Sequence, residues 1–164
     1  MTPLPASTPD AVLREAVTPG DLDVARALFR EYADMLGVPL DFQGFEEELA
    51  TLPGRYAAPG GAIVLAFAGT SPVGCVALRP LDEPGVCEMK RMFVRPAHQG
   101  RGLGRVLAGR ILADARARGY RVMRLDTLER LAPAVKLYES LGFRRIEPYG
   151  YNPLDGVLYF EAEL

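Results

Sequence analysis

The chain has 164 residues, of which 49% are hydrophobic and 24% are charged; this is the composition of a globular domain with its own core, and it excludes a disordered chain. The formal net charge of -2 excludes the strongly basic surface that general nucleic-acid binding needs, so no nucleic-acid partner is expected. The charge is unevenly distributed, because residues 1–89 hold 5 basic and 13 acidic side chains, residues 90–145 hold 14 and 4, and residues 146–164 hold 0 and 4. The basic middle segment could attract a polyanion to one surface.

The N-terminal part of the chain predicts a flexible arm followed by two helices. Residues 1–10 contain three prolines and are expected to form the arm, ahead of a single domain at residues 11–164. Apolar residues recur at helical spacing over residues 21–36, where Asp21 is expected to cap an amphipathic helix. A second, short helix is expected at about residues 45–50.

The middle of the chain predicts a group of antiparallel strands and then a long helix. Apolar strands are expected near residues 62–68, 73–80 and 86–94, and the short turn sequences between them indicate hairpins. The helix is expected from Arg101 to about Arg118, with Gly119 at its C-terminal end.

The last third of the chain alternates between strands and a helix. It predicts a strand at 122–127, a helix at 132–142 and further strands at 143–147 and 156–164. The order of elements indicates an α/β (α+β) fold with a mixed, mostly antiparallel sheet and helices on both faces.

Other features bear on location and on metals. The first ten residues lack the basic start and apolar core of a signal peptide, and the longest plainly apolar run, 62–68, is too short to span a bilayer, so a cytoplasmic protein without membrane association is expected. Cys75 and Cys87 lie in apolar, strand-like segments and are expected to be reduced, buried thiols. With one histidine in the chain, a His/Cys zinc site is excluded and no metal is expected.

The most informative segment is VRPAHQGRGLGRVL, at residues 94–107. A strand ends there, and Gly100, Gly102 and Gly104 open a helix. Glycines let the backbone approach a ligand closely, and the free N–H groups and dipole of a helix start favour an anion. Three arginines, Arg95, Arg101 and Arg105, add positive charge. The segment has neither the GxxxxGK[ST] of a nucleotide P-loop nor the GxGxxG of a dinucleotide site, and a tight turn with exposed arginines is the alternative interpretation.

Two motifs carry a family resemblance. Q-x-x-G-x-G occurs at Gln99, Gly102 and Gly104, directly after a strand ending in MFV-RP, and A-x-x-L-Y-E-x-L-G-F occupies residues 134–143. Both resemble the hallmark motifs of the GNAT superfamily of N-acetyltransferases, at the family's spacing, and the element order agrees over residues 21–164. The chain looks like a small GNAT enzyme of the bacterial type. The resemblance implies a sheet of about six to seven strands, splayed at its centre.

The resemblance also implies acetyl-CoA as the cosubstrate, lying where strands 86–94 and 122–127 part. The backbone of Met92, Phe93 and Val94 is then expected to pair with the pantetheine amides as an added strand does. A backbone N–H near Met92 is expected to polarise the thioester carbonyl.

The pyrophosphate of acetyl-CoA is implied to lie on the glycine-rich loop. Its expected contacts come from a run of seven residues, namely Gln99, Gly100, Arg101, Gly102, Leu103, Gly104 and Arg105. The sequence departs from the family at Leu131, where members often have Asn, so a contact of such an Asn with the pantetheine arm is not expected here.

Glu88 is the candidate general base. A primary ammonium has a pKa near ~10.4, so a group must remove its proton at neutral pH. By period-2 counting Glu88 shares a face of its strand with Met92 and Val94, and the histone-acetyltransferase branch of the family carries its base Glu at the same spacing. The alternative is a strand carboxylate paired to Lys90 or to an arginine.

Tyr138 is the candidate general acid, since it matches the Tyr that in the family commonly protonates the departing CoA thiolate. The alternative is a core aromatic on an amphipathic helix. His98, the chain's single imidazole, is interpreted as an exposed spacer in the loop rather than as a base.

The acceptor is expected to be a small amine or an amino-acid-like metabolite that attacks the thioester directly. Acidic residues of the first two helices and the loop between them would favour a cationic amine; these are Asp34, Asp41 and Glu46 to Glu48. Two alternatives stay open, a protein lysine or N-terminal amine as acceptor and a non-catalytic acyl-CoA-binding module. Because family members are often dimers, a homodimer is a further expectation.

Overall fold

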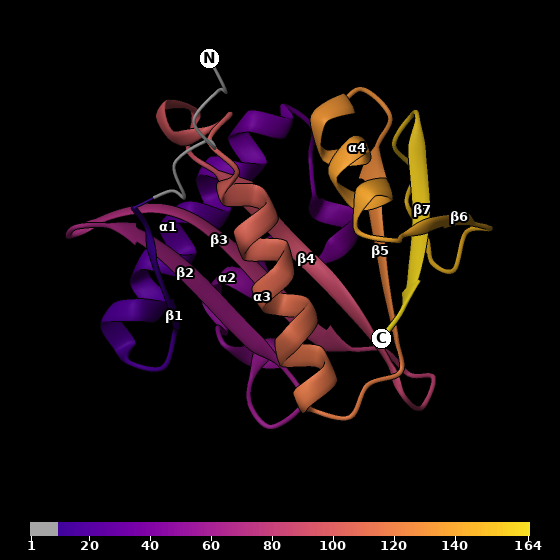
Figure 1. The fold of residues 1–164 in the computed structure, drawn as a ribbon, viewed down its shortest axis with the longest axis horizontal. Coiled ribbons are helices and arrows are strands. Elements are labelled where there is room, and N and C mark those ends of the chain that lie inside the picture. The colour runs from indigo at the N-terminus through magenta and orange to yellow at the C-terminus, as the bar shows by residue number, and fades with distance from the viewer. Residues whose placement is uncertain (1–9) are drawn as a thin grey trace, which may run out of the picture.

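Residues 10–164 are described by a computed structural model, and they build one seven-stranded sheet with helices on both faces (Figure 1). Apart from Asp10, the flexible arm predicted at residues 1–10 lies outside the described residues. The strands are β1 (Val12–Glu15), β2 (Ala62–Ala68), β3 (Ser71–Pro80), β4 (Val86–Val94), β5 (Val122–Leu128), β6 (Arg144–Ile146) and β7 (Val157–Glu163). The α-helices are α1 (Pro19–Leu36), α2 (Phe45–Ala50), α3 (Leu103–Ala117) and α4 (Ala132–Ser140), and the 3-10 turns are η1 (Asp41–Gln43), η2 (Gly54–Tyr56) and η3 (Pro96–His98).

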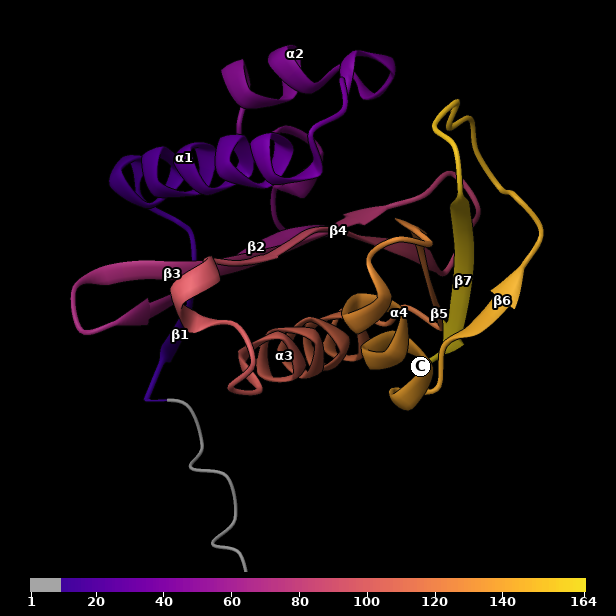
Figure 2. The same cartoon turned by 90° about the horizontal axis from the view of Figure 1, so that it is seen from above.

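The strands lie in the order β1-β2-β3-β4-β5-β7-β6, and every neighbouring pair is antiparallel except β4 and β5. Helices α1 and α2 cover one face of the sheet, and α3 and α4 cover the other (Figure 2). The predicted mixed, mostly antiparallel sheet is therefore confirmed. The sequence does not predict β1, because this strand has four residues and none of them is buried.

Helix α1 begins two residues earlier than the sequence predicts, and its cap is a different residue. Thr18 is the N-cap, and its hydroxyl accepts a hydrogen bond from the N–H of Asp21 at 3.1 Å. The Asp21 carboxylate accepts in return from the N–H of Thr18 at 3.4 Å, which completes a capping box. The prediction that Asp21 is the cap is wrong, because Pro19 suits the first helical position and shifts the start toward Thr18.

Strand β4 contains a β-bulge at Arg91. Cys75 of β3 lies opposite Phe93, and Ala77 lies opposite Lys90, so two residues of β4 face a single residue of β3. Arg91 has φ 59°, in the left-handed region that non-glycine residues rarely adopt. The bulge places Lys90 and Arg91 on the same face of the sheet, because Met89 and Met92, which flank them, both pack on the α3 side.

The bulge changes which residues of β4 share a face. Met92 and Val94 pack against the core between the sheet and α3, as Met89 does, whereas Phe93 belongs to the core under α1. Glu88 precedes Met89 and therefore faces the α1 side. The prediction that Glu88 shares a face with Met92 and Val94 is wrong, because period-2 counting fails across the extra residue.

The sheet opens at its parallel pair. Only Val86–Glu88 of β4 pair with Val122–Arg124 of β5. Beyond this point β4 continues along β3 to Val94, while β5 stays paired with β7 as far as Leu128. The two central strands consequently diverge, and within the described part of the chain the backbone of β4 after Glu88 has no partner strand on its β5 side.

Candidate active site

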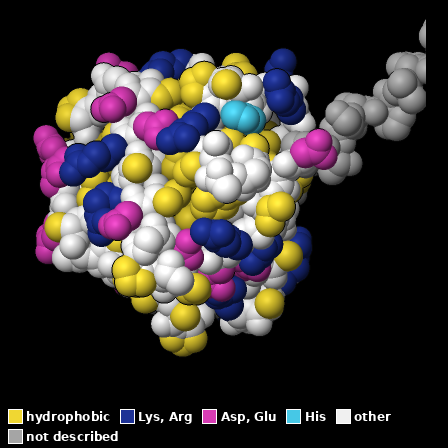
Figure 3. Space-filling view, turned by 90° about the vertical axis from the view of Figure 1, so that its left-hand side faces the viewer, with side chains coloured by type: hydrophobic (Ala, Val, Ile, Leu, Met, Phe, Trp, Pro, Cys, Tyr) yellow, Lys and Arg dark blue, Asp and Glu magenta, His cyan; other side chains and the backbone are white. Residues whose placement is uncertain are grey.

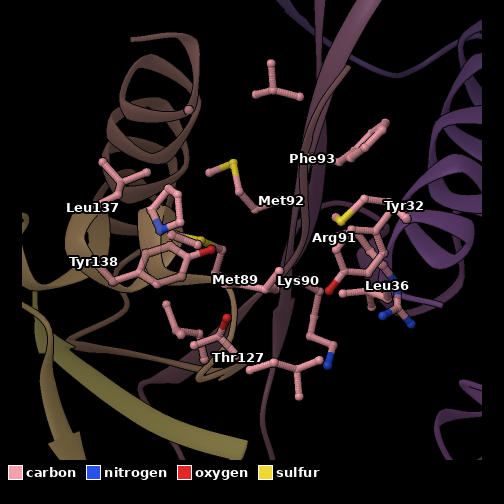
Figure 4. A pocket seen from close by; sticks show the side chains of 18 of the residues that line it. Tyr32, Leu36, Met89, Lys90, Arg91, Met92, Phe93, Thr127, Leu137 and Tyr138 are labelled. Atoms are coloured by element: carbon pink, nitrogen blue, oxygen red, sulfur yellow. The ribbon is translucent and has the colours of Figure 1, made fainter. Parts of the chain in front are cut away.

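A cavity of about 340 Å³ fills the opening between the diverging strands. Its walls come from α1, β4, the loop before α3, β5, α4 and the loop between β6 and β7. Figure 4 shows Leu137 and Tyr138 entering from α4 on one side of β4, and Tyr32 and Leu36 from α1 on the other. The cavity therefore connects the two faces of the sheet, with α4 beside it on one face and α1 beside it on the other.

The glycine-rich loop forms one end of the cavity. Gly100 has φ 77° and Gly102 has φ 83°, a backbone conformation that side chains with a Cβ rarely adopt, and Gly102 is the N-cap of α3. The Gln99 amide donates to the carbonyl of Val94 at 2.9 Å and so braces the loop against the end of β4. Among residues 10–164, no hydrogen bond uses the N–H groups of residues 100–105. Open N–H groups at a helix start provide an anion site.

The basic side chains beside this loop are not all those that the sequence predicts. Arg95 is bound to Glu31 at 2.6 Å and to the carbonyl of Pro72 at 2.6 Å, so it is directed away from the loop. Arg105 donates to the Ser140 hydroxyl at 2.6 Å and lines a shallow recess beside the glycines. Lys136 of α4 lines the same recess, and sequence reasoning missed it because its helix is 30 residues or so further along the chain.

Met92, Phe93 and Val94 all line the cavity. Their backbone lies along the part of β4 that β5 has left. An extended ligand could pair there as an additional strand. The side chain of Phe93 itself is buried under α1, edge-on to Tyr32 with the ring centroids 6.4 Å apart.

Tyr138 combines both interpretations that the sequence left open. Its ring is buried against Phe143, with the centroids 5.8 Å apart. It also lines the cavity, and Figure 4 shows its hydroxyl pointing from α4 toward β4 beside Met89. Burial raises the pKa of the Tyr138 phenol well above its usual value. The hydroxyl is therefore protonated at neutral pH and can act as a proton donor.

Glu88 is held in a network outside the cavity wall. It is 4% exposed, it lies 2.7 Å from the guanidinium of Arg79, and it accepts a hydrogen bond of 2.6 Å from the Tyr149 hydroxyl. It is absent from the residues that line the cavity. This is the geometry of a strand carboxylate paired to an arginine, and its role as general base stays a prediction.

Lys90, Asp126 and Asn152 form a polar group in the cavity, and the sequence did not reveal that these three residues meet. The Lys90 ammonium lies 3.3 Å from Asp126, and the Asn152 amide donates to the other carboxylate oxygen at 3.0 Å. Burial alone would raise the pKa of Asp126, but the charge of Lys90 and the hydrogen bond from Asn152 outweigh it and lower the pKa. These residues come from β4, β5 and the β6–β7 loop, so no local spacing signals them.

Arg91 links β4 to α2 and η1 on the α1 side of the cavity. Its guanidinium donates to Glu48 at 2.9 and 3.0 Å and to Gln43 at 2.7 Å, and only 1% of the side chain is exposed. Burial alone would lower the pKa of Arg91, but Tyr56 and the Glu48 carboxylate outweigh it and raise the pKa above the usual range. Glu48, one of the acidic residues predicted to attract the acceptor, is thus used to hold α2 on the sheet.

The acidic and basic segments of the chain largely neutralise each other. The other acidic residues named for the acceptor wall are exposed and absent from the cavity lining, namely Asp34, Asp41, Glu46 and Glu47. Six of the twelve ion pairs among residues 10–164 join residues 90–145 to the acidic segments: Arg91–Glu48, Arg95–Glu31, Arg118–Glu15, Arg124–Glu83, Arg124–Glu161 and Arg144–Glu161. On the face seen in Figure 3, both signs of charge are interspersed around hydrophobic side chains.

In the part of the chain that the structure describes, no helix has the length and apolar character to cross a bilayer. The same residues bring no three His, Cys, Asp or Glu side chains together in a group that could hold a metal ion.

Comparison with known proteins agrees with this architecture. The sequence model of the acetyltransferase (GNAT) family matches residues 25–143. An uncharacterized N-acetyltransferase of Schizosaccharomyces pombe is 43% identical over 148 residues, covering 89% of this chain and 90% of the relative. N-acetylaspartate synthetase of Rattus norvegicus is 34% identical over 105 residues, covering 64% of this chain and 35% of that protein. The solved structure of yncA from Salmonella typhimurium with its cofactor acetyl-CoA matches with a TM-score of 0.70 and 21% identity, over 94% of each chain.

Proposed function

Because the chain belongs to the GNAT acetyltransferase family, we propose that it transfers an acetyl group from acetyl-CoA to the primary amine of a small molecule. One observation carries the proposal: the unpaired edge of β4 leads directly to the open N–H groups of the glycine-rich loop. A strand edge suits the pantetheine amides, and a helix start suits the pyrophosphate. The acetyl-CoA bound to yncA, which shares the fold, supports the same cosubstrate here.

The residues around the cavity fit acetyl-CoA in chemical type. The backbone of Met92, Phe93 and Val94 would pair with the pantetheine arm. The seven loop residues would hold the pyrophosphate, and these are Gln99, Gly100, Arg101, Gly102, Leu103, Gly104 and Arg105. Lys136, in the recess beside the loop, would add positive charge for the phosphates.

The acceptor nitrogen would attack the thioester carbonyl carbon, forming a C–N bond as the C–S bond breaks. A backbone N–H near Met92 would stabilise the oxyanion. An acceptor that arrives as an ammonium ion gives up two protons. One of them replaces the proton that Tyr138 gives to the CoA thiolate, and the other passes through a base to solvent.

Two carboxylates are relevant to that base. Glu88 is the base predicted from the spacing along its strand, and because Arg79 and Tyr149 enclose it, it would act through water rather than by contact. Asp126 lines the cavity, but its lowered pKa makes it a weak base and keeps it charged. We therefore retain Glu88 as the candidate base and assign Asp126 to binding the amine.

A small acceptor is favoured over a protein because the acceptor side of the cavity is covered. The ring of Tyr151, in the β6–β7 loop, lies edge-on to Phe42 of η1 with the centroids 6.4 Å apart, so the loop and the α1–α2 connection meet there. N-acetylaspartate synthetase, which matches this chain over part of its length, is named for an acetylated amino acid, and this supports a small acceptor here.

The test is a spectrophotometric assay of thiol release from acetyl-CoA with amines, amino acids and peptides as acceptors, together with thermal unfolding in the presence of acetyl-CoA. We expect acetyl-CoA to raise the Tm and at least one small amine to release thiol. If acetyl-CoA does not raise the Tm, the proposal is refuted. If peptides alone are acetylated, the acceptor is a protein and not a small molecule.

A further inference from the structure

Two opposite charges face the acceptor side of the cavity at close range. The side chains of Lys90 and Asp126 are 7% and 15% exposed, and their charged atoms lie 3.3 Å apart. Asp126 is the one partner of the Lys90 ammonium among the described residues, so two of its three N–H donors are unused. Each oxygen of Asp126 accepts a single hydrogen bond and can accept another.

The rest of this chamber is apolar or already neutralised. Its walls are formed by Tyr32, Met35, Leu36, Leu40 and Leu154. Arg91 lies behind them with its charge matched by Glu48, so Lys90 and Asp126 are the charged groups left to meet a ligand. A buried ion pair gains little in stability over an apolar pair of the same size, because desolvation offsets the attraction. Stability alone therefore does not account for this pair.

We propose that the acceptor is an apolar α-amino acid, whose carboxylate binds Lys90 while its amino group binds Asp126. The inference rests on the proposed acetyl transfer. In an α-amino acid the two charged groups are joined through one carbon, which matches the close spacing of the two side chains. The apolar walls fit an aliphatic side chain. A monoamine would leave two of the Lys90 donors without a partner, and a buried donor without a partner lowers affinity.

The first experiment compares three acceptors that differ at one group. L-leucine, leucinamide and isopentylamine share the side chain and the primary amine, whereas the last two lack the carboxylate. The readout is kcat/KM from thiol release at saturating acetyl-CoA. We expect L-leucine to exceed both analogues by about 10- to 100-fold, the value of a charge-assisted hydrogen bond. Equal or higher kcat/KM for isopentylamine overturns the inference while leaving acetyl transfer established.

The second experiment changes the protein. Lys90→Met keeps the length of the side chain and removes its charge, and should raise the KM for L-leucine by about 10-fold or more relative to the KM for isopentylamine. Arg116→Met removes one charge from an exposed position on α3 that forms no ion pair with the other described residues, and it should change neither KM. Lys90→Arg restores the charge and should recover part of the L-leucine affinity.

Binding and turnover together distinguish failure of amino-acid recognition from failure of the proposed acetyl transfer. Binding of acetyl-CoA by Lys90→Met, measured by calorimetry, shows that the variant is folded. If the L-leucine and isopentylamine KM values then rise together, Lys90 supports the structure and does not recognise a carboxylate, and the inference fails. If no acceptor releases thiol from the unaltered enzyme and acetyl-CoA does not bind, the proposed function itself fails.

Discussion

Gly102 tests whether the start of α3 binds the pyrophosphate, because it can be compared with a matched glycine at the other end of the same helix. Gly102 has φ 83° and Gly119 has φ 86°, and an added Cβ at either position meets no atom of residues 10–164 within 4 Å. Alanine at either position should therefore cost the same backbone strain, about 1–2 kcal/mol. For a chain of this size this lowers the Tm by about 2–8 °C.

The two variants should differ in their affinity for acetyl-CoA. At Gly102 the added methyl group lies within the loop whose N–H groups are open, where the pyrophosphate is proposed to lie. Loss of one charge-assisted N–H contact weakens binding by about 10- to 100-fold. At Gly119 the methyl group lies 17 residues away, past the C-terminal end of α3, and should leave the affinity unchanged.

Calorimetric titration with acetyl-CoA gives the two dissociation constants, and thermal unfolding without ligand shows that both variants carry a similar strain. If Gly102→Ala and Gly119→Ala bind acetyl-CoA equally well, the pyrophosphate does not lie at the start of α3. A larger loss in Gly119→Ala would indicate that the helix as a whole, and not its first turn, determines the affinity.

Three further predictions use the same assays. Tyr138→Phe should lower kcat by about 10-fold or more with unchanged acetyl-CoA affinity, since it removes only a proton donor; an unchanged kcat would leave Tyr138 a core aromatic. Glu88→Gln should destabilise the fold to urea by about 3 kcal/mol because Arg79 loses its partner, and an unaltered pH profile of kcat would contradict its role as base. Burial raises the pKa of Tyr32 from 10.0 to about 12, so the folded state holds this proton more tightly and loses stability as pH rises through that interval. Tyr32→Phe should reduce this loss of unfolding free energy at high pH, measured by urea unfolding between about pH 9 and 12. Parallel plots of stability against pH for the variant and the unaltered protein would contradict the prediction.

The sequence predicts those elements whose apolar residues lie at a regular spacing. The two long helices and the apolar strands are found near their predicted places, since burial of one face determines them. The start of α1 is misplaced by two residues because a capping box can form one turn earlier than the apolar pattern begins. Strand β1 is missed because its stability comes from pairing with β2 and not from its own burial.

Of the candidate site, too, the sequence predicts the local part and misses the part that depends on the tertiary fold. The glycine-rich loop is local, and its residues are adjacent in the chain, so a motif is enough to find it. The acceptor side depends on Lys90, Asp126 and Asn152, which are separated by 36 and 26 positions and meet only after the sheet forms. The acidic residues near α1 and α2 suggested a cationic acceptor, but Glu48 is engaged by Arg91, and the others named lie on the surface.

The β-bulge links the two halves of the site, and the sequence contains a signal for it. In EMKRMFV, from Glu88 to Val94, two consecutive cations separate two methionines, which breaks the alternation of an unbulged strand. Without the extra residue, period 2 would direct Arg91 into the apolar core under α3. With it, Met89 and Met92 both stay on that side, Arg91 reaches Glu48 of α2, and Lys90 reaches Asp126 in the cavity. One inserted residue thus leaves an apolar wall on the side proposed for acetyl-CoA and directs charge to the side proposed for the acceptor.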